Sequence, residues 1–280
     1  MAYLITGASG SVGSGLVTQL AGRGLEIRTL TRKPLPGAAR QGVETFIGDL
    51  TTSTFPDGLL DGVQEVFLYP VEGSVDAFLK LAKSRGVRRV VLLSSLSVTE
   101  EHPQGQRSWA AKHHHDIEVA VQASGLAYTI LRPTAFANNL RWWASTIRTQ
   151  GKVFGPYPDS AQALIHEADI AAVAATVLTT PGHEGVAYPL TGPAAVSRRD
   201  QLAAIGLALG KELIFQAISP EQYRQSMRAH ISEEIVEMHL EDWSKTEKTP
   251  EVVHRTVERL TGRPARSARQ WALDHVKDFL

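Results

Sequence analysis

The chain has 280 residues, of which 43% are hydrophobic, so it is long enough to bury a sizeable core as one large or two modest domains. Lysine plus arginine and aspartate plus glutamate both number 29, and this balance gives no general field that would attract nucleic acid or an anionic membrane. The absence of cysteine excludes disulfides, thiolate chemistry and cysteine-ligated zinc.

The chain begins with an apolar run, residues 3–6, that leads into a turn with glycines at Gly7, Gly10 and Gly13. In this pattern one glycine allows a sharp turn, one lets backbone N–H groups approach a pyrophosphate, and one lets a helix pack closely on the strand. The helix that follows would present its positive dipole end to an anion. A purely structural turn is the alternative. The residues expected to hold the phosphates are Gly7, Ser9, Gly10, Ser11, Val12 and Gly13.

Strands and helices alternate through the rest of the first half. Apolar runs predict strands at residues 26–31, 43–47, 65–69, 89–94 and 128–133, and helical periodicity predicts helices that end near residues 22, 86 and 124. The run at 89–94 is apolar almost throughout, as in a strand that is buried on both faces. With right-handed crossovers, this order predicts an α/β fold with a Rossmann-type, doubly wound parallel sheet and a ligand crevice at the carboxyl ends of its strands.

The second half consists of shorter and more mixed segments. Helices are expected at residues 166–178 and 197–209, strands at 186–190 and 213–218, and polar helices from about residue 220 onward. We therefore divide the chain into a nucleotide-binding domain, residues 1–150, and a smaller, mainly helical substrate-binding lobe, residues 151–280. Residues 166–180 are expected to pack back on the first domain.

The residues after the second strand indicate which nucleotide binds. An acidic residue there accepts hydrogen bonds from the ribose 2′-OH of NAD, whereas an arginine suits the 2′-phosphate of NADP. Arg32 and Lys33 occupy this place, which favours NADP(H) over NAD(H); two solvated loop cations are the alternative. The expected site is completed by Asp49 and Leu50 at the adenine, Tyr69 and Pro70 at its ribose, Ser94 and Ser95 at the nicotinamide, and Pro133 at the end of the sixth strand.

These motifs resemble the atypical short-chain dehydrogenase/reductases, and within them the NmrA-like group that includes NADPH-dependent quinone oxidoreductases. Beyond the glycine triplet, the matching pieces are Gly48-Asp49-Leu50, Ser94-Ser95, Glu118 seven residues before Gly125, and residues 128–133, 169–173 and 260–264. They cover the chain almost end to end. The resemblance implies the fold and the cofactor, but the group includes reductases, isomerising enzymes and proteins that bind NADP without catalysis.

The sequence departs from the broader family at its catalytic Tyr-x-x-x-Lys pair, in which the tyrosine transfers a proton and the lysine lowers its pKa. The tyrosine position falls on Ala110 and the lysine position on His114; a shift of two residues places Ser108 and Lys112 there instead. Neither register restores the pair. Simple ketone reduction needs such a group at the oxygen, whereas a quinone can take hydride and collect protons from solvent.

Three adjacent histidines, residues 113–115, fall in a predicted helix. Neighbouring helical residues point about 100° apart, so three in a row cannot face one ion, and no metal site is expected. His114 is the candidate proton donor or ribose ligand in the crevice, and a surface or packing role is the alternative. His115 and Glu118 share a helix face, where a hydrogen bond between them is expected.

An aromatic group follows the sixth strand, where a substrate pocket would open. These rings could stack on a planar substrate or form the seam between the lobes. The residues concerned are Phe136, Asn139, Trp142 and Trp143.

Two functions follow from these features. The first is an NADPH-dependent oxidoreductase that transfers hydride to a quinone-like or conjugated small molecule bound between the lobes. The second is a redox sensor that binds NADP(H) without turnover and acts through a partner. No targeting pattern and no run near the roughly 20 apolar residues of a membrane span is evident. We expect a cytoplasmic monomer or homodimer that binds neither nucleic acid nor membrane.

Overall fold

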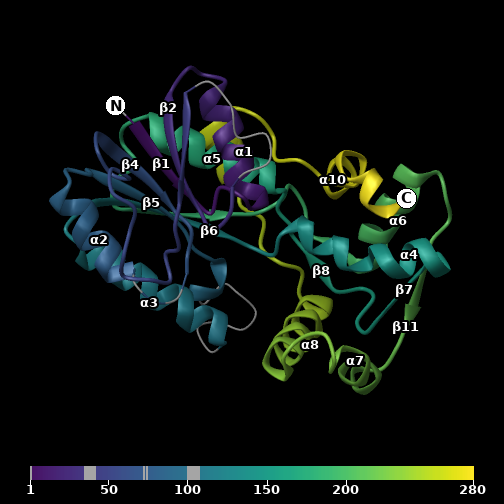
Figure 1. The fold of residues 1–280 in the computed structure, drawn as a ribbon. Helices are drawn as coiled ribbons and strands as arrows, with labels where there is room; N and C mark the ends of the chain where they lie inside the picture. The colour runs from purple at the N-terminus through teal and green to yellow at the C-terminus, as the bar shows by residue number, and fades with distance from the viewer. Residues whose placement is uncertain (1, 35–41, 72, 74, 100–107) are drawn as a thin grey trace.

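The computed structural model describes residues 2–34, 42–71, 73, 75–99 and 108–280. Its largest element is a seven-stranded sheet with the strand order β3-β2-β1-β4-β5-β6-β9, in which every pairing is parallel (Figure 1). This order confirms the predicted Rossmann-type α/β fold. The strands are β1 (Ala2–Thr6), β2 (Glu26–Thr31), β3 (Val43–Ile47), β4 (Val63–Leu68), β5 (Arg89–Leu93), β6 (Ala127–Pro133) and β9 (Val186–Leu190).

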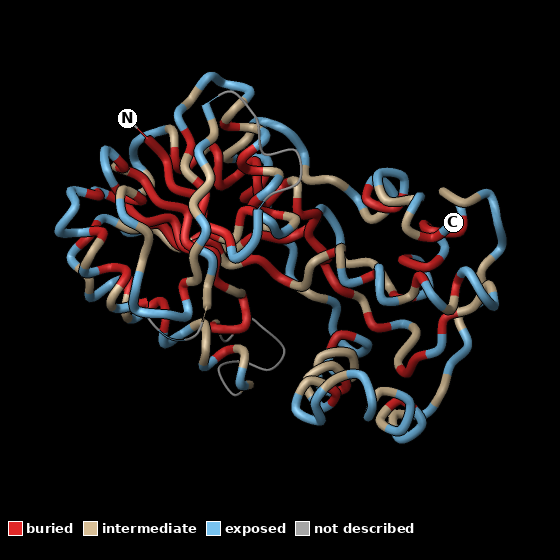
Figure 2. The backbone as a smooth tube through the Cα atoms, in the orientation of Figure 1, coloured by how far each residue is buried: buried red, intermediate tan, exposed pale blue. Residues whose placement is uncertain are grey.

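Helices cover both faces of the sheet. On one face lie α1 (Ser11–Ala21), α5 (Glu167–Thr179) and α9 (Thr256–Thr261), and on the other α2 (Val75–Ser84) and α3 (Trp109–Ala123). Along β1, Tyr3 and Ile5 pack toward α1 and α5, whereas Leu4 packs toward α2 and α3. Both faces are therefore apolar, and the sheet is the most completely buried part of the molecule (Figure 2).

Two segments of the second half of the chain return to this sheet. Helix α5 packs against α1, and β9 extends the sheet beside β6. Arg89 on β5 helps to hold α5 in place, because it donates a hydrogen bond to the Leu178 carbonyl at 3.0 Å and pairs with Glu65 of β4 at 2.7 Å. The chain after residue 151 thus contributes to both units of the molecule.

The remaining elements form a smaller, mainly helical lobe beside the sheet (Figure 1). Its helices are η3 (Ala137–Trp143), α4 (Ala144–Gln150), α6 (Arg198–Leu209), α7 (Pro220–Met227), α8 (Glu233–Lys248), α10 (Ala268–Asp274) and η4 (Val276–Phe279). Two small sheets pair β7 (Lys152–Gly155) with β11 (Ile214–Ala217) and β8 (Ala161–Gln162) with β10 (Val196–Ser197). In the described parts of the chain, no helix combines the length and hydropathy needed to cross a membrane.

Candidate active site

The carboxyl ends of the parallel strands meet at one edge of the main sheet, where ligands bind in folds of this kind. The residues expected to contact the nucleotide lie just after strands β1 to β5, except Pro133, which is the last residue of β6. The fold therefore brings them to the same edge, although they span more than 120 residues of sequence. They are Gly7, Ser9, Gly10, Ser11, Val12, Gly13, Arg32, Lys33, Asp49, Leu50, Tyr69, Pro70, Ser94, Ser95 and Pro133.

The glycine turn leaves no room for larger residues at two of its positions. Gly7 has a φ of +62°, and a Cβ added there would lie 2.8 Å from the Cβ of Tyr69. A Cβ at Gly13 would lie 2.9 Å from the Cα of Ala8, because α1 packs directly on the turn. Gly10 precedes α1 without a side-chain cap, and the first turn of the helix carries no acidic residue. Its N–H groups are thus available to an anion.

Thr6, which the sequence reasoning missed, ties the end of β1 to the end of β4. Its buried hydroxyl donates a hydrogen bond to the Phe67 carbonyl at 3.0 Å and accepts one from the Tyr69 N–H at 2.7 Å. Tyr69 is thereby held beside Gly7, with 45% of its surface exposed at the edge of the sheet. The sequence signal that could have identified Thr6 is a polar residue at the end of an otherwise apolar strand.

The ends of β2 and β3 carry the candidate residues for the adenosine half. Arg32 and Lys33 are exposed, and the Thr31 hydroxyl donates to the Lys33 carbonyl at 2.7 Å, which orders this turn. Asp49 accepts a hydrogen bond from the Thr51 N–H at 2.9 Å. This bond, with a smaller contribution from the Arg32 charge, lowers the pKa of Asp49. The Leu50 side chain is buried in the core on the α2 side.

A buried ion pair lies under the ends of β5 and β6. The Glu118 carboxylate accepts hydrogen bonds from Arg132 at 3.0 and 2.6 Å and from the Ser94 hydroxyl at 2.5 Å. The expected bond between His115 and Glu118 is therefore wrong: His115 is exposed, and both carboxylate oxygens bind partners on the sheet. Ser95 caps the short helix η1 (Leu96–Val98) by accepting the Ser97 N–H at 3.2 Å.

The alternative register of the catalytic pair, Ser108 and Lys112, has a structural explanation. The Ser108 hydroxyl caps α3 by accepting a hydrogen bond from the Ala111 N–H at 3.0 Å. The Lys112 ammonium pairs with Asp116 one turn along the helix at 2.7 Å, and both side chains are exposed. In this structure both side chains thus bind groups of α3 itself.

The three histidines of α3 lie in different environments, as their helical spacing requires. His114 is largely buried, and within the described structure its Nδ1 has no hydrogen-bond partner. Burial, assisted by the neighbouring His113, lowers the pKa of His114 to about 4. Its ring is therefore neutral near pH 7 and can donate or accept a hydrogen bond, but it does not carry the proton of an imidazolium.

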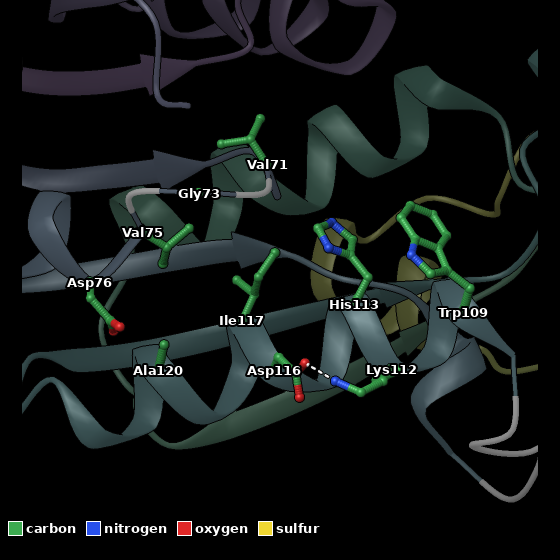
Figure 3. A pocket seen from close by; sticks show the side chains of 10 residues that line it. All are labelled: Val71, Gly73, Val75, Asp76, Trp109, Lys112, His113, Asp116, Ile117 and Ala120. Carbon is green, nitrogen blue, oxygen red and sulfur yellow. Dashed lines mark hydrogen bonds and ion pairs between the residues drawn. The ribbon is translucent and has the colours of Figure 1, made fainter. Parts of the chain in front are cut away.

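A pocket of about 320 Å³ lies between α3 and the segment after β4 (Figure 3). Val71 and His113 face it from opposite sides, and Trp109 stacks parallel on His113 with ring centroids 5.3 Å apart. His114 is not among its lining residues. The pocket thus lies on the side of α3 that carries His113.

The aromatic residues after β6 separate into two groups. Trp142 is 58% exposed and lies 5.6 Å, centroid to centroid, from His239 of α8; Asn139 is also exposed. Trp143 instead packs inside the lobe, 6.3 Å from the ring of Phe215. Phe136 is partly buried against the sheet core. Trp143 therefore belongs to the core of the lobe rather than to a seam between the lobes, while Trp142 leaves a ring face open.

Behind Trp142, the lobe has a polar and aromatic core that sequence reasoning missed. Arg198 is buried with its guanidinium 3.7 Å from the ring centre of Trp243, and burial lowers its pKa to about 10. Burial, with the Arg198 charge, also lowers the pKa of His239 to about 4, and burial raises that of Tyr223 to about 12. The Tyr223 hydroxyl and His239 Nδ1 are 3.2 Å apart, a contact that links α7 to α8.

Comparison with known proteins gives a family and several relatives. A family model described as NAD(P)H-binding matches residues 7–181. The chain is 36% identical to a (4-alkanoyl-5-oxo-2,5-dihydrofuran-3-yl)methyl phosphate reductase from Streptomyces griseus, over 99% of this chain and 98% of the relative. It is 32% identical to an NAD(P)H azoreductase from Xenophilus azovorans, over 99% and 98% of the two chains.

A solved structure shares the fold. An NADPH-dependent quinone oxidoreductase from Escherichia coli, complexed with NADPH, superposes with a TM-score of 0.80 at 23% identity. The match covers 96% of this chain and 98% of the other. The two chains therefore share the fold over nearly their whole length.

Proposed function

Because the chain belongs to the NAD(P)H-binding family, we propose that it transfers hydride from NADPH to a quinone-like or otherwise conjugated small molecule bound between its two units. The reductase class and the resemblance to the NmrA-like group are confirmed by the matches. The identity of the acceptor, the preference for NADPH and the roles of individual residues are our proposals and are not given by the matches.

The turn at the end of β1 fits a dinucleotide. A Cβ would collide with neighbouring atoms at Gly7 and Gly13, and the uncapped start of α1 offers N–H groups to a pyrophosphate. NADPH, when bound, supplies the hydride. Arg32 is exposed at the same edge and can reach a 2′-phosphate, which is the basis for preferring NADPH over NADH.

The register of α3 supports the choice of acceptor and is the observation that carries the proposal. Ala110 and His114 stand where a tyrosine and a lysine would act, and burial keeps His114 neutral. No strong acid is thus presented to an acceptor oxygen from these positions. A conjugated acceptor spreads the incoming negative charge over several atoms and can collect its proton from water. His114 serves as a neutral hydrogen-bond donor to the ribose or to the acceptor.

The named relatives support the same class of acceptor. The Streptomyces relative is named for a substrate whose ring double bond is conjugated with carbonyl groups, and the Xenophilus relative for an azo compound. Each name describes reduction of a conjugated, planar group. Trp142, with an open ring face, is the residue we assign to stacking on such a group, beside Phe136 and Asn139.

Steady-state oxidation of NADPH tests the proposal. The purified protein should turn over a naphthoquinone, an azo dye or an unsaturated lactone, and should leave a simple aliphatic ketone unchanged. Stoichiometric NADPH binding without oxidation by any of these acceptors would sink the reductase proposal and favour a redox sensor. Efficient reduction of the simple ketone would overturn the choice of acceptor alone, because it would require a proton donor that Ala110 and a neutral His114 do not provide.

A further inference from the structure

Two histidines and a glutamate meet where the last helices of the chain contact the start of α5. His275, which follows α10, places its Nε2 2.7 Å from Oε1 of Glu167. His166, which caps α5, places its Nδ1 3.4 Å from the other oxygen, Oε2. One ligand atom from each of the three residues lies within 4.8 Å of the others. The Glu167 carboxylate thus lies between two imidazole nitrogens.

The far nitrogen of each imidazole faces a second carboxylate. His166 Nε2 is 3.2 Å from Oδ2 of Asp274, and His275 Nδ1 is 3.2 Å from Oδ2 of Asp278. In metal sites, a ligating histidine almost always passes its other N–H to a carboxylate, a carbonyl or water, which fixes the ring and its tautomer. Both histidines here have a carboxylate as outer partner, and Glu167 lies on their inner side. His275 Nδ1 is also 3.3 Å from Nη2 of Arg141, which pairs with the same Asp278.

His166 Nδ1 already serves as a hydrogen-bond acceptor in this cluster. The Ala168 N–H donates to it at 3.1 Å, so this nitrogen carries a lone pair rather than a proton. A metal ion at Nδ1 would take that lone pair in place of the Ala168 N–H, because an imidazole nitrogen has only one. Glu167 Oε2 accepts the Trp271 indole N–H at 3.2 Å, which orients the carboxylate.

The cluster contains more acidic than basic side chains. Among the described residues, its three carboxylates, those of Glu167, Asp274 and Asp278, contact one guanidinium, that of Arg141, which pairs with Asp278 at 2.6 Å. The three carboxylates therefore outnumber the guanidinium, which favours a cation between them.

We propose that His166, Glu167 and His275 bind a zinc ion, with Asp274 and Asp278 as partners of the two histidines. Two imidazole nitrogens and a carboxylate oxygen suit zinc better than magnesium or calcium, which prefer oxygen ligands. Zinc bonds of about 2.0–2.1 Å in a tetrahedral site separate the ligands by roughly 3.4 Å. The distance from His166 Nδ1 to Glu167 Oε2 already has this value, whereas His275 Nε2 and Glu167 Oε1, now 2.7 Å apart, would have to move apart. The Asp274 side chain is 41% exposed, which gives an ion a route from solvent.

The ion would act as a structural clip. His166 and Glu167 lie at the start of α5, which packs on α1 behind the glycine turn, whereas His275 lies 108 residues from Glu167. Zinc would therefore fasten the end of the chain to the nucleotide-binding unit. It would stabilise the fold without contacting the reacting groups, so this inference is independent of the proposed reaction.

The test uses full-length, tag-free protein that has been treated with a chelator. Titration with ZnCl2 in a calorimeter should give one ion per chain, and the melting temperature should rise until that ratio is reached. MgCl2 should produce neither effect. His275→Gln keeps a hydrogen-bond donor near Glu167 but is a poor zinc ligand, so it should fold, bind NADPH normally and lose the zinc-dependent rise in melting temperature. Asp278→Asn should weaken zinc binding about tenfold.

A double variant, His113→Ala with His115→Ala, is the matched control because it removes two histidines of the other cluster. It should keep the full zinc response. Absence of one-to-one binding in the wild type, or an undiminished response in His275→Gln, would overturn the proposal. Loss of the response in the α3 control alone would assign the zinc to the histidine run instead. If His275→Gln does not fold, Glu167→Gln is measured in its place, with the same expected loss.

Discussion

Arg132 at the end of β6 donates two hydrogen bonds to the carboxylate of Glu118 on α3, at 3.0 and 2.6 Å. The Ser94 hydroxyl after β5 donates to the same carboxylate, so one buried side chain joins α3 to two strands. His114 lies one helical turn before Glu118. The position that replaces the lysine of the catalytic pair is thereby held against the carboxyl edge of the sheet.

Replacing Glu118 with glutamine keeps the shape of the side chain but removes its charge. We expect the free energy of unfolding of Glu118→Gln to fall by about 3 kcal/mol, because the Arg132 guanidinium loses its counter-charge in a mostly buried site. Chemical denaturation measures this change. Asp116→Asn on the same helix is the control, since its ion pair with Lys112 is exposed. Equal effects of the two variants would contradict the role assigned to Glu118.

Alanine at Gly7 should damage nucleotide binding. Gly7 and Gly24 both have positive φ, +62° and +72°, so alanine costs about 1–2 kcal/mol of stability at either position. Only at Gly7 would the new Cβ meet the Tyr69 side chain; around Gly24 no described atom lies within 4 Å of it. We expect NADPH affinity to fall at least about tenfold in Gly7→Ala and to stay normal in Gly24→Ala, as measured by fluorescence titration.

The preference between the two nucleotides should depend on Arg32. Removing a charged hydrogen-bond partner of the 2′-phosphate costs about 1.5–3 kcal/mol, so Arg32→Ala should bind NADPH at least about tenfold more weakly while NADH binding barely changes. Arg23→Ala is the control, because Arg23 follows the C-terminal end of α1, at the far end of this helix from the glycine turn. Equal losses for both nucleotides would show that Arg32 does not read the 2′-phosphate.

The pH dependence of turnover should not show His114 titrating as an ordinary histidine. Because burial lowers the pKa of His114 to about 4, the ring loses its proton well below pH 6 and stays neutral above it. The pH profile of kcat/KM should therefore show no inflection near pH 6.5 from this residue. His114→Ala should lower kcat by about tenfold, the value of one hydrogen bond, without changing the shape of the profile. An inflection near neutrality that disappears in His114→Ala, but persists in the exposed control His115→Ala, would refute the neutral role.

The two adjacent tryptophans of η3 should behave differently. Trp142 is largely exposed, so Trp142→Ala should raise the KM for a planar acceptor several-fold with little change in melting temperature. Trp143 packs inside the lobe, so Trp143→Ala should lower the free energy of unfolding by about 3 kcal/mol. Steady-state kinetics and thermal unfolding separate the two effects. An unchanged KM in Trp142→Ala would remove it from the substrate site.

Local patterns were sufficient to predict most of the architecture. The apolar run of β5 predicted a strand buried on both faces, and every residue of β5 is buried in the structure. The strand expected at residues 186–190 is also present, but its place as the seventh strand of the main sheet depends on contacts with β6. Periodicity identifies an element, whereas its neighbours in a sheet are chosen by long-range packing.

The side-chain partners within the site could not be read in the same way. The sequence suggested His115 as the partner of Glu118 because the two are three residues apart; the structure instead brings Arg132 and Ser94 to it from two strands. Arg198 gave no signal of its aromatic surroundings, since those rings come from other elements.

By itself, the sequence determined the glycine turn, the alternation of strands and helices, and the absence of a tyrosine–lysine pair, because each depends on residues that are close along the chain. Only the tertiary structure decided that His114 has a buried ring nitrogen and that Arg132 and Ser94 are the partners of Glu118. It alone brought His275 to Glu167 across 108 residues. Burial and long-range contact set the charge and partners of a side chain, and neither is a property of its neighbours in sequence.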